Sequence, residues 1–352
     1  MAKKILFFVL AVIILLVVVI IISGRKTAPS ANQTTGQAAS RSFYLGVVPT
    51  PKNLPNSTFE DLTAAYVETG KIAEVTMVWT DVNIGQTEKL KQNRVITALG
   101  VYGLKPILTL NFATIKEVPG RGLQYVIDAP AGVKADLADP QFRSQWVGEA
   151  KSLAKEFKPP YLSLGNEIND YFYLHPDDLK KYFSLYNEAY KEIKAVSPKT
   201  KVFVVFSYTH LIDNNQWDLL RQFNGRSDLI GLTTYPRAYF NDPSEIPDDY
   251  YTRLDQYVDK PVAFTEIGWP SSSAQGDSEK KQADFLTKFI ELTKGMNVEM
   301  INWLFLHEPE IGGVADKIVD PGTASISLRN KDGTEKEVYG VWLGIKKIPY
   351  RR

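Results

Sequence analysis

The chain has 352 residues, no cysteine, three histidines and a formal net charge of +1 at pH 7. This charge balance excludes a nucleic-acid partner, which would need a basic excess to neutralise its phosphates. The missing cysteines exclude disulfides, thiolate metal sites and a cysteine nucleophile, and three histidines argue against a His-rich metal site. We therefore expect no metal and no cofactor.

The N-terminal segment is much more hydrophobic than the rest of the chain. Lys3 and Lys4 precede an unbroken apolar run from Ile5 to Ile22. A helix of that length would be about 27 Å long, close to the thickness of the hydrocarbon core of a bilayer. The run ends in Ser23-Gly24-Arg25-Lys26, which is a poor cleavage site, so we favour an uncleaved signal anchor over residues 1–26.

The expected location of the protein follows from this segment. The positive charge at the N-terminus favours a single-pass protein of the cell membrane, with residues beyond the anchor outside the cell. If the segment is cleaved instead, the remainder is secreted. Residues 27–41 are rich in Ser, Thr, Gln and Ala and predict a flexible linker to a folded domain over residues 42–352.

From residue 42 onward, apolar runs rich in β-formers alternate with longer amphipathic segments. The predicted strands, in chain order, are Phe43–Val48, Ile72–Trp79, Lys105–Asn111, Tyr161–Glu167, Lys201–Ser207, Leu229–Tyr235, Val262–Glu266 and Met300–Leu306. The predicted helices are Thr58–Glu68, Leu90–Tyr102, Pro140–Phe157, Pro176–Val196, Gln216–Phe223, Tyr250–Val258, Ser278–Lys294 and Tyr339–Lys347, with Asp177 and Ser278 as N-caps.

This alternation predicts a parallel sheet covered by helices. Eight β-α units in a domain of this size fit a (β/α)8 barrel of the α/β class. A doubly wound open sheet is the alternative, but the first predicted strand is not followed by a Gly-rich phosphate loop. Residues 112–139 form the longest β-to-α connection, and their Gly and Pro residues predict a loop over the carboxyl ends of the strands.

Two glutamates stand at the ends of predicted strands. Glu167 follows Leu164-Gly165-Asn166 after the fourth strand, and Glu266 ends the seventh strand in Thr265-Glu266-Ile267-Gly268-Trp269-Pro270. The carboxyl ends of barrel strands are where barrel enzymes place their chemistry. A pair of carboxylates there suits glycosidic bond cleavage, in which one group donates a proton and the other acts as nucleophile or base.

These two motifs resemble the retaining glycoside hydrolases of clan A, a large group of barrel enzymes. The Gly-Asn-Glu-Ile-Asn sequence at Glu167 looks like that of endo-β-1,4-galactanases, and Glu-Ile-Gly-Trp-Pro-Ser at Glu266 looks like that of plant and fungal β-1,3-glucanases. The resemblance implies that Glu167 is the acid/base and Glu266 the nucleophile. The chain departs from many clan members because Met77-Val78-Trp79-Thr80 stands at the end of the second strand, where an Arg that contacts the nucleophile is usual.

The neighbours of the two glutamates are candidate substrate-binding residues. Asn166 would hydrogen-bond the sugar 2-hydroxyl in the transition state, and Tyr235 at the end of the sixth strand would donate to Glu266. Trp303 on the eighth strand is a candidate platform for sugar stacking. The remaining candidates end other strands and are expected to line the cleft: Trp269, Trp79 and Asn111.

The leading interpretation is an exported, membrane-tethered β-glycosidase that hydrolyses a β-linked polysaccharide or oligosaccharide by double displacement. A transglycosylase with the same site, which passes the glycosyl unit to another sugar, is one alternative. A non-catalytic carbohydrate-binding protein on a barrel scaffold is another, and a structure with the two carboxyl groups far apart would favour it.

Overall fold

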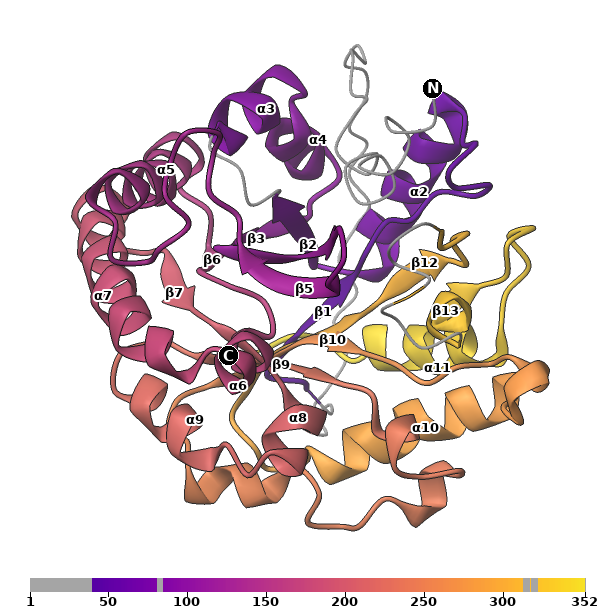
Figure 1. The fold of residues 1–352 in the computed structure, drawn as a ribbon. Coiled ribbons are helices and arrows are strands. Elements are labelled where there is room, and N and C mark those ends of the chain that lie inside the picture. Colours follow the sequence, from indigo (N-terminus) through magenta and orange to yellow (C-terminus); the bar gives the residue numbers. More distant parts are fainter. Residues whose placement is uncertain (1–39, 81–84, 313–316, 318–321, 352) are drawn as a thin grey trace.

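The computed structural model describes residues 40–80, 85–312, 317 and 322–351 (Figure 1). The predicted signal anchor and most of the predicted linker lie outside these residues. Within the described ranges, no helix is long and apolar enough to cross a membrane. Arg41, expected at the end of the linker, belongs to the folded domain, because it is buried and pairs with Glu74 and with the backbone near Tyr350.

A parallel sheet forms the centre of the domain, in the order β7-β6-β3-β2-β1-β11-β10-β9-β8. Each of the eight predicted runs overlaps at least one of these strands. The strands are β1 (Tyr44–Val47), β2 (Val75–Thr80), β3 (Lys105–Leu110), β6 (Tyr161–Ser163), β7 (Lys201–Phe203), β8 (Val205–Ser207), β9 (Ile230–Thr234), β10 (Val262–Ile267) and β11 (Val298–Trp303).

The two edges of this sheet meet in one segment of chain. β7 pairs with β6 on one side, and β8 pairs with β9 on the other, although only Val204 separates β7 from β8. Together they make the fifth strand of the predicted barrel. The sheet therefore runs once around, as a (β/α)8 barrel does.

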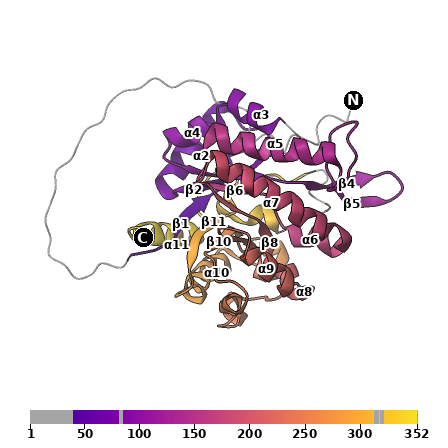
Figure 2. The ribbon, with the colours of Figure 1, turned by 90° about the vertical axis from the view of Figure 1, so that its left-hand side faces the viewer.

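Helices surround the sheet (Figures 1 and 2). They are α2 (Phe59–Ile72), α3 (Gln86–Gln92), α4 (Val95–Val101), α5 (Pro140–Phe157), α6 (Ile168–Leu174), α7 (Leu179–Val196), α8 (Tyr208–Asp213), α9 (Trp217–Asn224), α10 (Glu279–Leu292) and α11 (Glu337–Lys346). Ser278 caps α10 as predicted, by accepting the N–H of Lys281. Asp177 does not cap a helix, because a 3-10 turn over Pro176–Asp178 precedes α7.

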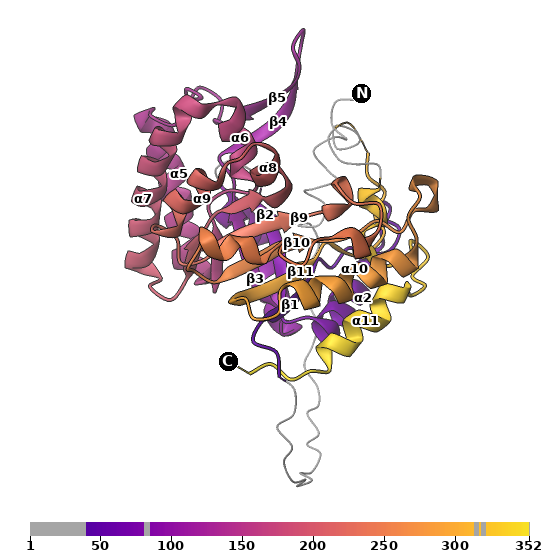
Figure 3. The same ribbon diagram turned by 90° about the horizontal axis from the view of Figure 1, so that it is seen from below.

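Three connections differ from the prediction. The helix expected over Leu90–Tyr102 is split between α3 and α4, because Arg94 adopts a left-handed φ of 51°. Tyr250–Val258 forms a 3-10 helix over Thr252–Gln256. The long connection after β3 holds an antiparallel hairpin of β4 (Ala113–Val118) and β5 (Gly122–Ile127), which projects beyond the strand ends near α6 (Figures 2 and 3).

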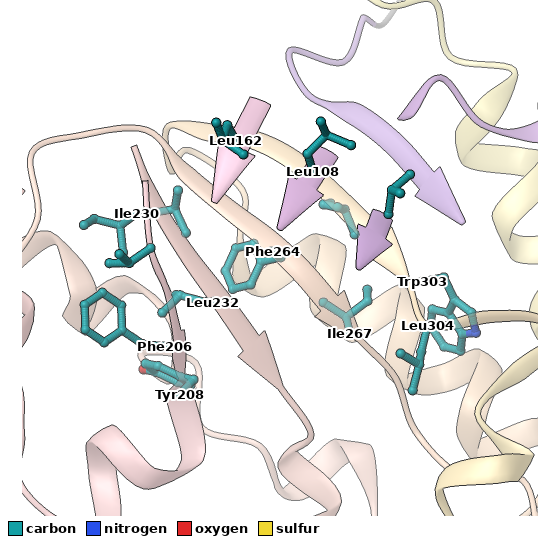
Figure 4. Close-up of a cluster of buried hydrophobic side chains, with 14 of the residues drawn as sticks. Leu108, Leu162, Phe206, Tyr208, Ile230, Leu232, Phe264, Ile267, Trp303 and Leu304 are labelled. Carbon is teal, nitrogen blue, oxygen red and sulfur yellow. The ribbon is translucent and has the colours of Figure 1, made fainter. Parts of the chain in front are cut away.

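Apolar side chains pack in two layers on either side of the sheet. One face of the strands fills the barrel interior, with Val75, Met77, Ile107, Phe203 and Met300 among its members. The other face packs against the surrounding helices, and Figure 4 shows part of this layer, including Leu108, Phe264, Ile267 and Trp303. Since alternate residues of a strand point to opposite faces, the interior layer defines which positions open into the barrel mouth.

Candidate active site

A β-bulge aims Glu266 into the barrel mouth. In β10, Phe264 pairs with Leu232 and Glu266 with Thr233, so two residues of β10 span one step of β9. The same extra residue appears against β11, where Phe264 pairs with Ile301 and Ile267 with Trp303. A bulge changes which face a side chain occupies, and this one places Glu266 beside Thr233.

Glu167 reaches the same mouth from a tight turn after β6. Gly165 has φ +151°, and a Cβ on it would lie 2.5 Å from the Ile168 side chain. Glu167 itself has a left-handed φ of 48° and is the N-cap residue of α6. A non-glycine residue held in this region costs free energy, and such strain is concentrated at functional sites.

Neutral donors hold the Glu266 carboxylate. The Tyr235 hydroxyl donates to Oε2 at 2.7 Å, and Asn166 Nδ2 donates to Oε1 at 3.3 Å. The indole of Trp79 also hydrogen-bonds this carboxylate. Burial raises the pKa of Glu266 above its ordinary value, and these three hydrogen bonds oppose that rise.

The Glu167 carboxyl group accepts a hydrogen bond from Thr233, whose hydroxyl lies 2.5 Å from Oε1. Burial, and then the negative charge of Glu266, raise the pKa of Glu167 to about 8. The two carboxyl groups thus interact electrostatically across the mouth, and the pair titrates as a unit. The raised pKa of Glu167 favours a state in which the pair holds one proton at neutral pH and Glu167 carries it.

Asn166 retains an unused acceptor in the mouth. Its Oδ1 is buried and, within the described part of the chain, has no hydrogen-bond partner. The Asn166 backbone N–H donates to Asn111 Oδ1 at 2.8 Å, which fixes the turn that carries both Asn166 and Glu167. Asn111 therefore lies at the site, where its side-chain oxygen holds the turn that carries Asn166 and Glu167.

The predicted tryptophans divide into two groups. Trp79 lies at the mouth, where it is partly exposed and contacts Glu266. Trp269 and Trp303 are fully buried. Trp269 donates to Asp277 and packs on Phe285, and Trp303 packs between Phe285 and Trp342 in the layer outside the barrel (Figure 4).

The burial of Trp303 follows from strand alternation. Trp303 pairs with Val47 and Ile267, which belong to the outer layer, so its side chain faces the helices. Trp269 and Trp303 expose no face to a sugar in this structure, and we leave them out of the substrate-binding set. Both residues instead support the strands that carry the site.

The sequence reasoning did not identify three residues near the pair. Thr233 lies two positions before Tyr235 in the sixth strand, and side chains two positions apart in a strand point to the same face. This alternation could have indicated that Thr233 also faces the site. Asp170 and His210 form an ion pair at 2.7 Å beside Glu167, and both influence its charge. No sequence signal joins these two, because α6 and α8 meet only in the folded barrel.

The geometry supplies the parts of a glycosidase. Among the described residues, no group of His, Cys, Asp and Glu could hold a metal ion. One carboxyl group is poised to carry a proton, and another is oriented by neutral donors. This combination can protonate a leaving oxygen while an anion faces the other side of a sugar ring.

Comparison with known proteins agrees with this chemistry. Residues 150–311 match the family model described as glycosyl hydrolase family 53. That segment covers somewhat less than half of the chain and includes Glu167, Tyr235 and Glu266. No curated protein sequence matches the chain.

Several solved structures share the fold. An exo-β-1,4-mannosidase from Opitutaceae bacterium strain TAV5 superimposes with a TM-score of 0.66 at 12% identity, covering 90% of this chain and 62% of the mannosidase. The GH5_18 protein from Streptomyces cattleya in complex with GlcNAc gives a TM-score of 0.62 at 16% identity, covering 89% and 83%. A glucosidase from Croceicoccus marinus gives 0.59 at 14% identity, covering 89% and 69%.

Proposed function

We propose that this chain, a glycoside hydrolase of clan A by its family match and its fold, hydrolyses a β-linked polysaccharide with retention of configuration. Glu167 acts as the acid/base and Glu266 as the nucleophile. The observation that carries the proposal is the pair itself, with the proton favoured on Glu167 and neutral donors on Glu266.

The reaction takes two steps. Glu167 protonates the glycosidic oxygen while Glu266 attacks the anomeric carbon, and a covalent glycosyl-enzyme forms as the leaving sugar departs. Glu167, now ionised, then removes a proton from water as the water attacks the same carbon and releases Glu266. In the intermediate Glu266 is an uncharged ester, so its negative charge no longer raises the pKa of Glu167. Glu167, which has given its proton to the leaving group, therefore stays ionised and can act as the base.

Asn166 and Tyr235 assist the same reaction. The unpartnered Asn166 Oδ1 is suited to accept a hydrogen bond from the sugar 2-hydroxyl, which strengthens as positive charge develops. Tyr235 keeps its proton, because burial and the nearby Glu266 raise its pKa well above the ordinary value, so it remains a donor to the nucleophile. Trp79 completes the donor set in a position where many clan members have an Arg.

The test is an activity screen of the chain without residues 1–26, which keeps the buried Arg41, against β-glucans, β-1,4-galactan and β-mannans. We expect new reducing ends from at least one polymer, and we expect the first-formed product to have the β configuration by NMR. Initial release of the α-anomer would contradict retention. Binding of a polymer without turnover would indicate a non-catalytic carbohydrate-binding protein instead.

We also propose that the N-terminal run tethers this enzyme to the cell membrane with its domain outside the cell. The support is the basic residues at Lys3 and Lys4 followed by the apolar run from Ile5 to Ile22. The full chain should remain with membranes after a high-salt wash, and deletion of residues 1–26 should release a soluble domain. Recovery of the protein in the medium, beginning near residue 24 or 38–40, would show cleavage and overturn the tether.

A further inference from the structure

Asp170 and His210 form a polar pair that the proposed reaction does not use. The Asp170 carboxylate and His210 Nδ1 lie 2.7 Å apart. Asp170 is in the first turn of α6, where its N–H donates to the Glu167 carbonyl at 3.1 Å. Asp170 is therefore within one helical turn of the acid/base, on the short helix that Glu167 caps, and His210 reaches it from α8.

A buried asparagine fixes the position of this pair. Asn169 accepts the Ser207 N–H at 2.8 Å and donates to the Ser207 carbonyl at 3.1 Å, and Gln216 satisfies its remaining groups. Because Ser207 ends β8 and caps α8, these bonds lock the start of α6 against the start of α8. His210 and Asp170 thus face each other from two helices with little freedom to separate.

The pair lies beside Glu167: Asp170 is in the helix that Glu167 caps, both Asp170 and His210 act on the charge of Glu167, and neither is among the groups that shift the pKa of Glu266. α6 and α8 follow the fourth and fifth strands of the barrel, whereas Glu266 ends the seventh, beyond β9. Glu266 attacks one side of the anomeric carbon, and the acid/base protonates the oxygen that leaves on the other. The sugar attached to that oxygen would therefore lie beside Glu167, where α6 begins.

His210 remains available to a ligand. Its side chain is 49% exposed, and among the described residues its Nε2 has no hydrogen-bond partner. Asp170 accepts the proton on Nδ1, so Nε2 is an acceptor in the neutral ring and a donor in the charged ring. A sugar hydroxyl can pair with either form, since it both donates and accepts.

An aromatic ring lies beside the pair. Tyr239 is 37% exposed, and its hydroxyl is anchored on α8 by the Thr209 carbonyl, next to His210. Anchoring the hydroxyl leaves the ring face as the exposed part. A flat apolar face next to a hydrogen-bonding group suits a sugar ring, which has apolar faces and polar edges.

We propose that Asp170, His210 and Tyr239 form the subsite that binds the leaving-group sugar of the substrate, and that this sugar is uncharged. His210 hydrogen-bonds a hydroxyl of that sugar, Asp170 holds the imidazole in place, and Tyr239 supports the ring. Because Asp170 compensates the charge of His210, the pair offers hydrogen bonds without the net positive charge that a uronic acid would favour. This inference rests on the proposed glycosidase activity.

The test compares two probes on the same variants. One probe is the neutral tetrasaccharide of the polymer that the screen identifies, and the other is the 2,4-dinitrophenyl β-glycoside of the corresponding disaccharide. The aryl group leaves without a sugar in the proposed subsite. The variants are His210→Ala, His210→Gln and Tyr239→Ala, with Gln222→Ala on α9 as a control at an exposed site near the other end of the barrel.

We expect His210→Ala to lower kcat/KM for the tetrasaccharide roughly tenfold, which corresponds to one lost hydrogen bond, with less than a twofold change for the aryl glycoside. His210→Gln should recover part of the loss, because its amide can pair with a hydroxyl. Tyr239→Ala should lower the tetrasaccharide value several-fold. Gln222→Ala should change neither probe.

Equal losses on both probes would overturn the subsite, since they would mean that His210 supports the fold or the part of the site that both probes use. A loss on the tetrasaccharide alone that comes with a shift of the alkaline limb of kcat/KM would overturn it too, since it would mean that His210 acts through Glu167, whose proton the aryl probe does not need. An unchanged tetrasaccharide value would also overturn it. In each of these cases the wild-type chain still cleaves both probes, so the subsite would be wrong while the proposed glycosidase function stands. If the wild-type chain cleaves neither probe, the proposed glycosidase function fails, and the leaving-group subsite fails with it.

Discussion

The two ends of the barrel interior each bury carboxylates, but they treat the charge differently. At the amino ends of the strands, Glu299 is 1% exposed, accepts a hydrogen bond from Tyr161 at 2.5 Å and pairs with Lys201 Nζ at 2.6 Å. At the carboxyl ends, Glu167 and Glu266 have hydroxyl, amide and indole donors, and no described Lys or Arg forms an ion pair with either. One end compensates its negative charge with a cation, and the other does not.

This difference separates a structural carboxylate from a reactive pair. A cation beside a buried carboxylate stabilises the ionised form and would make proton transfer harder. Neutral donors orient the carboxyl groups but leave protonation open to change by a neighbouring charge. The mouth is thus built so that the charge on one glutamate controls the proton on the other.

The strongest test of this comparison is Glu266→Gln. It preserves the size of the side chain but removes the nucleophile, so we expect kcat on the identified polysaccharide to fall by about 10⁴-fold or more. Steady-state kinetics measure this, with the melting temperature as a control for folding. Activity within tenfold of wild type would mean that Glu266 is not the nucleophile.

Glu167→Ala should have a smaller effect that depends on the leaving group. Polysaccharide hydrolysis should fall by about 10²–10⁴-fold, because the general acid is lost. An activated aryl glycoside should still form the glycosyl-enzyme, and azide should rescue its second step, since azide needs no general base.

The configuration of the rescued product assigns the two roles. A β-glycosyl azide from Glu167→Ala is the expected product, because azide displaces Glu266 from the α-linked intermediate. An α-glycosyl azide would reverse the two assignments. NMR of the product distinguishes them.

At the other end of the barrel, Glu299→Ala should affect stability and not chemistry. Removal of the carboxylate leaves the buried Tyr161 hydroxyl and Lys201 without this partner, so unfolding should become easier by about 1–3 kcal/mol. Denaturant titration measures the loss, while kcat of the folded enzyme should stay within twofold. A matched change in an exposed pair, Asp284→Ala beside Lys280, should cost less than about 0.5 kcal/mol. A large loss of kcat in Glu299→Ala would remove the distinction between the two ends.

The smallest expected effect is that of Trp79→Phe, which removes one neutral donor and keeps an aromatic ring. Since that hydrogen bond lowers the pKa of Glu266, its loss should raise this pKa further. Glu266 must be ionised to attack, so the rate falls as the pH drops through its pKa, and the acidic limb of kcat/KM should move to higher pH. The alkaline limb, set by loss of the proton from Glu167, should stay near pH 8. We expect a fall of about tenfold in kcat/KM at pH 6; an unchanged acidic limb would show that Trp79 does not act on the nucleophile.

The sequence by itself determined which strand ends carry the candidate site. Glu167, Asn166 and Tyr235 all follow apolar β-rich runs, and parallel strands bring their carboxyl ends to one edge whatever the details of packing. The same regular alternation predicted the barrel, and it succeeded because eight β-α units have few other ways to bury both faces of a parallel sheet.

Only the tertiary structure decided which way several side chains point. The bulge at Glu266 changes the side-chain alternation of β10, whereas the unbroken pairing of β11 with β1 turns the Trp303 side chain away from the mouth. The hairpin after β3 and the Asp170–His210 pair likewise depend on contacts between distant segments. The composition of a strand indicates where it ends. One extra residue in the pairing with a neighbouring strand, however, reverses the face on which the following side chains lie. Whether that extra residue is present depends on strands that are far away in the sequence.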